Sequence, residues 1–197
     1  MLLKKKLILA SASHRRKNLL TQIGLTFEVR ASEIDEQFDL GRSVQENVQS
    51  LALQKAFAVA EAGDDAIIVG ADTVVVLGSE ILTKPRDEQE ARLMLAKLSG
   101  REHIVHTGIA LVDLPTRRTV AGVETTKVKF RTLSSEEISE YVKSGSPMDK
   151  AGAYGIQDDY GAVFVERIDG CFYNVVGFPL ARFYVAVSEF QKLLGLV

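Results

Sequence analysis

The sequence predicts an α/β fold in which helices flank a mixed, twisted sheet. Segments typical of strands and of helices alternate along the 197 residues. Leu7–Ala10 is a short, wholly apolar run, as expected of a buried strand. Two longer segments, 103–114 and 119–133, resemble the two strands of an antiparallel pair. The same alternation shows no clear linker, so we expect residues 1–197 to form a single domain.

The first elements follow one another closely. After the strand at 7–10, Ser13 predicts a helix N-cap, and Gly24 stands where a C′ glycine ends a helix. The stretch "TFEVRA" (26–31) alternates like a second strand, and "SEIDEQFDLG" (32–41) is an acidic loop. Leu19, Leu20 and Ile23 make one apolar face of this first helix.

A second helix and a long strand come next. Ser43 and Glu46 form a capping box at the start of this helix, and "AIIVGADTVVVL" (66–77) indicates a buried strand that passes through Gly70. Lys55 falls in the middle of the apolar stripe of the helix. The other members of that stripe are Val44, Val48, Leu51, Ala52 and Val59.

The second half of the chain continues the alternation with signals of four kinds. These are an Asp87–Glu90 helix start ended by Gly100, a capping box at Ser134 and Glu137, a hairpin at Asp169-Gly170, and Pro179 at position N1 of the last helix. A smaller lobe built from roughly residues 30–60 and 85–150 is compatible with this order.

Composition excludes several classes of protein. The formal net charge is −2, whereas binding to nucleic acid or to a membrane surface usually needs a basic excess. No apolar run reaches the length of a membrane span, and the apolar part of "KKKLILASA" is too short for a signal peptide. The single cysteine, Cys171, rules out an internal disulfide and fits a reducing, cytoplasmic location.

Cations gather at the start of the first helix. The N-terminus of a helix already carries partial positive charge and unpaired N–H groups, so Arg15 and Arg16 there are unfavourable unless an anion binds. Ser11 and Ser13 add hydroxyl donors, and a strand, a small-residue turn and a helix start together can form a phosphate site. The alternative is that Ser13 is only an N-cap and both arginines are solvated.

Asp72 and Lys55 are charged residues in apolar surroundings. Asp72 interrupts the apolar strand, and a buried carboxylate needs a metal, a lysine or a cleft to offset its desolvation. Lys55 either has an anionic partner in the interior or extends along the surface to water. Lys84 and Lys150 are weaker candidates for the same chemistry.

Oxygen ligands for a divalent cation are available in the acidic loop. Its carboxylates are Glu33, Asp35 and Glu36, and such ligands with phosphates nearby suit Mg²⁺ or Mn²⁺. We take Glu36 and Asp72 as the metal ligands. His103 and His106 are three residues apart on a predicted strand and would point to opposite faces, so we expect no zinc site there.

Nine ordered stretches together resemble the Maf family of nucleotide pyrophosphatases over nearly the whole chain. They are "LASASHRRKNLL", "EIDE", "ALQKA", "GADTVVVL", "KPRD", "TGIAL", "VKFRTLS", "DKAGAYGIQ" and "VVGFPL". The resemblance implies a mixed α/β fold with a cleft between two lobes, and hydrolysis of nucleoside triphosphates to the monophosphate and pyrophosphate with a divalent metal. One departure is His14, where the family usually has proline. Proline makes no polar side-chain contact, so we expect only a small loss of rigidity.

The resemblance also assigns roles. The family's proton acceptor corresponds to Asp72, and the branch acting on dTTP and UTP has the residues found here as Arg15, Thr73 and Gln157. The residues that we expect to bind the phosphates are Ser11, Ser13, Arg16, Lys55 and Lys84.

Two rival functions remain. One is removal of damaged nucleotides, as in the structurally similar inosine triphosphate pyrophosphatases. The other is a regulator of cell division and septum formation that binds nucleotides without turnover. The expected partners are nucleoside triphosphates, with a homodimer left open and neither nucleic acid nor membrane.

Overall fold

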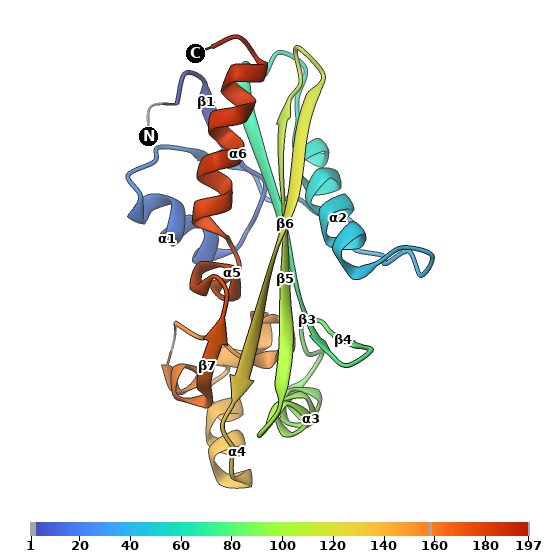
Figure 1. Cartoon of the computed structure of the whole chain (residues 1–197), viewed down its shortest axis with the longest axis vertical. Coiled ribbons are helices and arrows are strands. Elements are labelled where there is room, and N and C mark those ends of the chain that lie inside the picture. The colour runs from blue at the N-terminus through green and yellow to red at the C-terminus, as the bar shows by residue number, and fades with distance from the viewer. Residues whose placement is uncertain (1–2, 158, 197) are drawn as a thin grey trace. The chain divides into compact units, whose positions relative to one another are not determined.

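The computed structural model describes residues 3–157 and 159–196. It contains a seven-stranded mixed sheet and flanking helices, so the predicted fold class is confirmed (Figure 1). The strands are β1 (Lys6–Leu9), β2 (Glu28–Val29), β3 (Ala66–Leu77), β4 (Glu80–Leu82), β5 (Glu102–Asp113), β6 (Arg118–Phe130) and β7 (Val165–Asp169). The α-helices are α1 (His14–Gln22), α2 (Val44–Ala58), α3 (Glu88–Leu98), α4 (Ser135–Lys143), α5 (Phe172–Val176) and α6 (Leu180–Leu193). Three short 3₁₀ helices are η1 (Ser146–Asp149), η2 (Ala151–Ala153) and η3 (Asp159–Phe164).

The strand order is β2-β1-β3-β5-β6-β7, with β4 paired to β3. The short β1 runs parallel to both of its neighbours, and its residues Lys6–Leu9 lie opposite Ala66–Val69 of β3. β4 and β7 are antiparallel to β3 and β6 respectively. Buried on both faces, β1 and β3 are apolar along most of their length, as the sequence predicted.

The chain forms two compact units. Unit 1 contains 1–72, 107–124 and 177–197, and unit 2 contains 73–106 and 125–176. The expected smaller lobe was therefore partly wrong, because 30–60 belongs to unit 1 and unit 2 extends to 176. The segment 43–58 is helical and packs on the β3 and β5 strands of unit 1, which explains its place.

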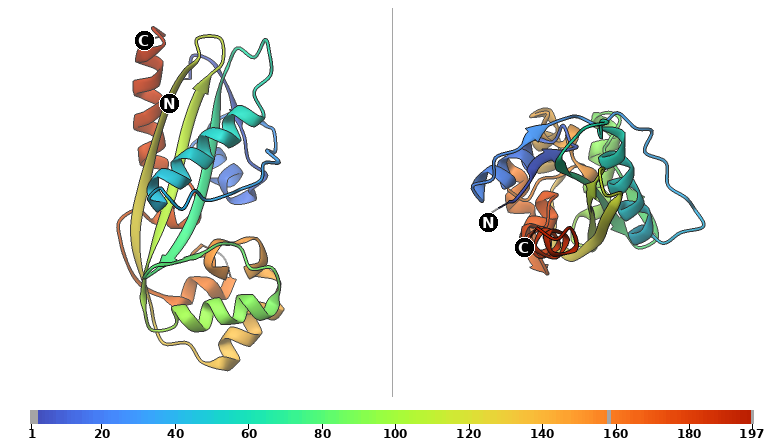
Figure 2. Two further views of the ribbon diagram at one scale, coloured as in Figure 1. Left: turned by 90° about the vertical axis from the view of Figure 1, so that its right-hand side faces the viewer. Right: turned by 90° about the horizontal axis from the view of Figure 1, so that it is seen from above.

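In unit 1, α2 and α6 cover opposite faces of the sheet (Figures 1 and 2). Gly108 of β5 faces α2, while the adjacent Ile109 faces α6, because successive strand residues point to opposite sides. The fully buried phenylalanines of α6, Phe183 and Phe190, contribute to the core of this unit. In unit 2, α3 and α4 pack on each other and on η1 and η2.

The predicted helix caps are confirmed, but three local predictions were wrong. Ser13, Ser43, Asp87 and Ser134 each accept a hydrogen bond from the backbone N–H three residues later. The Asp169-Gly170 hairpin does not form, because Phe172–Val176 is the helix α5. Within it, buried Asn174 donates hydrogen bonds to Val105 O and Thr126 Oγ1, which holds the segment against β5 and β6.

The last helix begins at Leu180, so Pro179 is its N-cap residue rather than N1. The second strand is shorter than predicted, with only Glu28 and Val29 paired. Among the described residues, none of the helices combines the length and the apolar character that a membrane crossing needs.

Candidate active site

The start of α1 follows directly from the end of β1. Ser13 is the N-cap in extended conformation, and its Oγ accepts a hydrogen bond from Arg16 N at 3.5 Å. Ser11 Oγ in turn accepts from Ser13 N at 3.2 Å. The first turn of α1 has no acidic residue, so the positive end of the helix dipole is not neutralised by its own side chains.

Arg16 connects the start of α1 to β3 by hydrogen bonds near Asp72, the last β3 residue that belongs to unit 1. Its Nη1 donates to Ala71 O at 2.9 Å and to Ser11 Oγ at 3.1 Å, and its Nε donates to Gly177 O at 3.0 Å. Burial lowers the pKa of Arg16, and the nearby carboxylate of Asp72 opposes that shift. The two carbonyl acceptors were missed by sequence reasoning, because a backbone acceptor leaves no mark on residue type. The only signal was that Gly177 lies within the quoted stretch "VVGFPL".

Lys55 brings two carboxylates to one point. Its Nζ lies 2.5 Å from Asp72 Oδ1 and 2.8 Å from Glu36 Oε1. Lys55 and Asp72 are only 7% and 5% exposed, whereas the Glu36 side chain is half-exposed. Of the two interpretations of Lys55, the interior lysine with an anionic partner is confirmed.

Two glycines explain why α2 delivers Lys55 to Asp72. A Cβ added to Gly70 would lie 1.9 Å from Ala52 O, and one added to Gly108 would lie 2.2 Å from Val48 O. The backbone of α2 therefore lies directly on β3 and β5, closer than any side chain would allow. Gly70 and Asp72 are two residues apart and share a face of β3, and Lys55 is three residues beyond Ala52 on the facing helix. The close approach thus sets the position of the ion pair.

The carboxylates near Lys55 are suitable ligands for a divalent cation, but they do not form a complete metal site by themselves. In the described part of the chain, no group of three or more His, Cys, Asp or Glu side chains could hold a metal. Two convergent carboxylates, Glu36 and Asp72, nevertheless fit Mg²⁺, which is commonly held by one or two carboxylates plus substrate phosphates.

The remaining predicted site residues belong to unit 2. Thr73 follows Asp72 along β3 and is half-buried, Lys84 is exposed in the loop after β4, and Gln157 is half-buried after η2. Lys150 is buried, and its Nζ donates to Ser146 O at 2.6 Å and lies 2.9 Å from Asp149 Oδ1. Unit 1 therefore brings together Ser11, Ser13, Arg16, Glu36, Lys55 and Asp72, and Arg15 is close enough to Arg16 to lower its pKa.

The two histidines of β5, His103 and His106, form hydrogen bonds inside the protein. His103 Nε2 is 2.8 Å from Tyr154 Oη, and His106 Nδ1 is 2.9 Å from Thr125 Oγ1. Burial lowers the pKa of both rings, to about 4 for His103. Both histidines are therefore neutral core residues at neutral pH.

Comparison with known proteins adds the family. A dTTP/UTP pyrophosphatase of Bacillus cereus (strain G9842) is 48% identical over 187 residues, which cover 95% of this chain and 96% of the relative. Proteins with the same name from Acetivibrio thermocellus and Pelotomaculum thermopropionicum are 50% and 45% identical. Each match covers 94% of this chain, and 95% and 97% of the respective relative. The family model described as "Maf-like protein" matches residues 6–190, and the chain therefore belongs to the Maf family.

Proposed function

We propose that this chain is a nucleoside triphosphate pyrophosphatase that hydrolyses dTTP and UTP to the monophosphate and pyrophosphate. The observation that carries the proposal is the buried Lys55–Asp72 pair with Glu36, next to a cationic helix start. The names of the relatives, dTTP/UTP pyrophosphatase, support the choice of substrate.

In the reaction, a water oxygen forms a bond to the α-phosphorus, and the bond from that phosphorus to the bridging oxygen breaks. Pyrophosphate leaves with the bridging oxygen, and the water proton needs an acceptor. We assign that role to Asp72, because it is a carboxylate in an apolar strand that Lys55 keeps in a fixed position.

The phosphates of the substrate need cations and N–H donors. The start of α1 offers backbone N–H groups together with Ser11, Ser13, Arg15 and Arg16. Lys84 is a further cation for the leaving pyrophosphate. A divalent cation held by Glu36 and Asp72 would neutralise developing charge on the phosphate oxygens.

Lys55 has two tasks in this proposal. It keeps the two carboxylates close together, and it adds positive charge where the triphosphate binds. Lys55 and Asp72 are both buried, and separating them would leave each charge without its partner. We therefore expect the pair to stay intact without substrate.

The base would be chosen by Thr73 and Gln157. Thymine and uracil present an O4 acceptor, an N3–H donor and an O2 acceptor, and an amide offers both a donor and an acceptor to two adjacent positions. Cytosine reverses two of these partners and would leave polar groups unpaired, at a cost of ~1–3 kcal/mol for each group. A pocket that accepts the thymine methyl need not reject uracil, because one methyl group discriminates weakly.

The test is pyrophosphate release from dTTP, UTP, CTP, GTP and 7-methyl-GTP under one metal condition. We expect kcat/KM for dTTP and UTP to exceed the others by at least about tenfold. Equal rates with CTP or a guanine nucleotide would contradict the choice of base but not the reaction. Nucleotide binding without release of pyrophosphate would contradict the enzyme itself.

A further inference from the structure

The outer edge of β6 in unit 1 has no strand beside it. β7 pairs with β6 only from Lys127 to Phe130, so Arg118–Glu124 has β5 on one side and, among the described residues, no strand on the other. Burial agrees with an open edge: every residue of β5 from 107 to 113 is buried, and none from 118 to 124 is. This stretch therefore presents backbone N–H and C=O groups to another chain.

The edge carries none of the usual features that prevent pairing. Natural edge strands are protected by lysine, proline or a bulge. Thr119–Val123 reads Thr-Val-Ala-Gly-Val, with no charge and no proline, and the irregularity of β6 lies farther on, at Lys129 and Phe130. Charges stand only at its two ends, Arg118 and Glu124.

The order of these residues is self-complementary. In an antiparallel pair centred on Ala121, Arg118 lies opposite Glu124 of the second copy, and the two-fold axis repeats this contact. Val120 then lies opposite Gly122, whose missing side chain leaves room, and Thr119 lies opposite Val123. Opposite charges and β-branched pairs placed directly across strands are stabilising. We propose that two copies of this chain form a homodimer by antiparallel pairing of β6 around Ala121.

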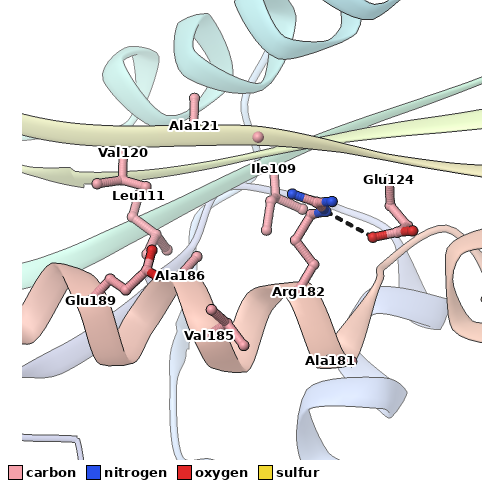
Figure 3. A pocket seen from close by; sticks show the side chains of 11 residues that line it. Ile109, Leu111, Val120, Ala121, Glu124, Ala181, Arg182, Val185, Ala186 and Glu189 are labelled. Atoms are coloured by element: carbon pink, nitrogen blue, oxygen red, sulfur yellow. Dashed lines mark hydrogen bonds and ion pairs between the residues drawn. The ribbon is translucent and has the colours of Figure 1, made fainter.

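The surface beside the edge is suited to this arrangement. A groove of about 370 Å³ lies between α6 and the β5–β6 strands (Figure 3), and none of the predicted site residues line it. At its β6 wall, Arg182 Nε donates to Glu124 Oε2 at 2.7 Å, and the Glu124 side chain stays 26% exposed. A second guanidinium, from Arg118 of the second copy, can therefore reach the same carboxylate.

The helix side of the groove has exposed apolar surface between the charged residues Arg182 and Glu189. Val185 of α6 is 52% exposed and lines the groove. Because the two-fold axis is perpendicular to the sheet, the two α6 helices lie on one face of the joined sheet, on either side of the axis. The second copy thus extends the sheet and places apolar side chains next to both grooves.

Disulfide trapping tests the register. In a Cys171→Ala background, whose lost side chain makes none of the hydrogen bonds to Thr126, Ala121→Cys should cross-link into dimers on oxidation. Residues directly opposite in an antiparallel pair have Cα atoms about 4.5–5.5 Å apart, within disulfide reach. Thr119→Cys is the matched control, because its two copies would lie about 13 Å apart and should not cross-link. Cross-linking of both variants alike, or of neither, would overturn the proposal.

Light scattering tests the dimer itself. The unmodified chain should be dimeric at about 50 µM. Ala121→Lys should weaken the dimer at least about tenfold, because two lysines would then face each other across the axis. Leu93→Lys, at an exposed residue of α3, adds the same charge away from β6 and should leave the dimer intact. Pyrophosphate release by both variants checks their folding. A monomeric chain, or a dimer that Ala121→Lys does not weaken, would overturn the proposal, including the case in which the edge binds a different protein.

Discussion

At the scale of single residues, Lys55 and its two carboxylate partners, Asp72 and Glu36, matter for both stability and chemistry. Asp72 is buried, whereas Glu36 is half-exposed and remains in contact with water. If Asp72 is changed, Lys55 keeps Glu36 as a partner at 2.8 Å. Its charge is therefore not left unpaired, and the fold should survive the change.

We expect Asp72→Asn to remain folded and to lower kcat for pyrophosphate release by at least about 10²-fold, because the amide cannot accept the water proton. The measurement is kcat with dTTP, together with the thermal midpoint. Asp65→Asn is the matched control, since Asp65 is an exposed carboxylate that also pairs with a lysine, Lys5, and its loss should leave kcat unchanged. An Asp72→Asn protein with more than about a tenth of normal kcat would refute the assignment.

His103 makes stability depend on pH. The ring is 1% exposed, its Nδ1 has no hydrogen-bond partner among the described residues, and burial lowers its pKa to about 4. Between the unfolded pKa of about 6.5 and the folded value, only the unfolded chain binds the proton. The stabilisation is therefore full above pH ~6.5 and decreases as the pH falls toward the folded pKa, by roughly 2 kcal/mol at pH 5.

The check compares the free energy of unfolding at pH 7.5 and pH 5 for the unmodified chain and for His103→Gln. Glutamine keeps a hydrogen-bonding group for Tyr154 and removes the titration. The unmodified chain should lose about 2 kcal/mol more than the variant, while contributions from carboxylates and from His106 cancel. Equal losses in both proteins would show that His103 does not titrate in this window.

At the scale of elements, the contact of α2 with the sheet links packing to the site. Gly70 is tightly enclosed, because an added Cβ would meet Ala52 O and, at 2.9 Å, Ala56 N. These atoms belong to the helix backbone and cannot rotate away, so α2 would have to move. Any such movement carries Lys55 away from Asp72.

We therefore expect Gly70→Ala to destabilise the fold by about 1–3 kcal/mol and to lower kcat as well. Gly41→Ala is the control, since its added Cβ would meet only the end of the Asp39 side chain, at 3.3 Å, and no helix backbone. Urea unfolding and pyrophosphate release measure the two effects. A Gly70→Ala protein with normal stability would show that α2 is less closely packed than described.

Local sequence patterns predicted most elements, and the exceptions have physical causes. Helix starts were predictable because a cap is a short-range hydrogen bond between residues three apart, as at Ser43 and Ser134. The helix α5 was not, because Asn174 is held by distant β5 and β6 rather than by its neighbours. The same distinction holds for the site. The place of Lys55 in an apolar stripe made an anionic partner one of two alternatives, whereas the carbonyl contacts of Arg16 depend on tertiary structure alone.

At the scale of the whole molecule, neither compact unit is a continuous piece of chain. The backbone passes between the units four times, at 72–73, 106–107, 124–125 and 176–177. No single cleavage of the chain can yield either unit complete. This interleaving could not be read from the sequence, because no linker marks any of the four passages.

We expect the two units to unfold together in one transition, since each depends on segments that the other interrupts. Calorimetry is the measurement: the calorimetric and van't Hoff enthalpies should agree, and far- and near-ultraviolet circular dichroism should change at one temperature. Two separable transitions would show that the units fold independently and that the expected single domain is wrong.

The position of α6 in the chain also has a consequence for synthesis. The helix covers Ile109 and Leu111 of β5, yet it begins at Leu180, roughly seventy residues later in the chain. At ordinary ribosomal speeds this delay lasts about 3–14 s. The nascent chain therefore carries one uncovered apolar sheet face during that time, so its yield in a cell should depend on chaperone capacity as well as on the stability of the finished fold.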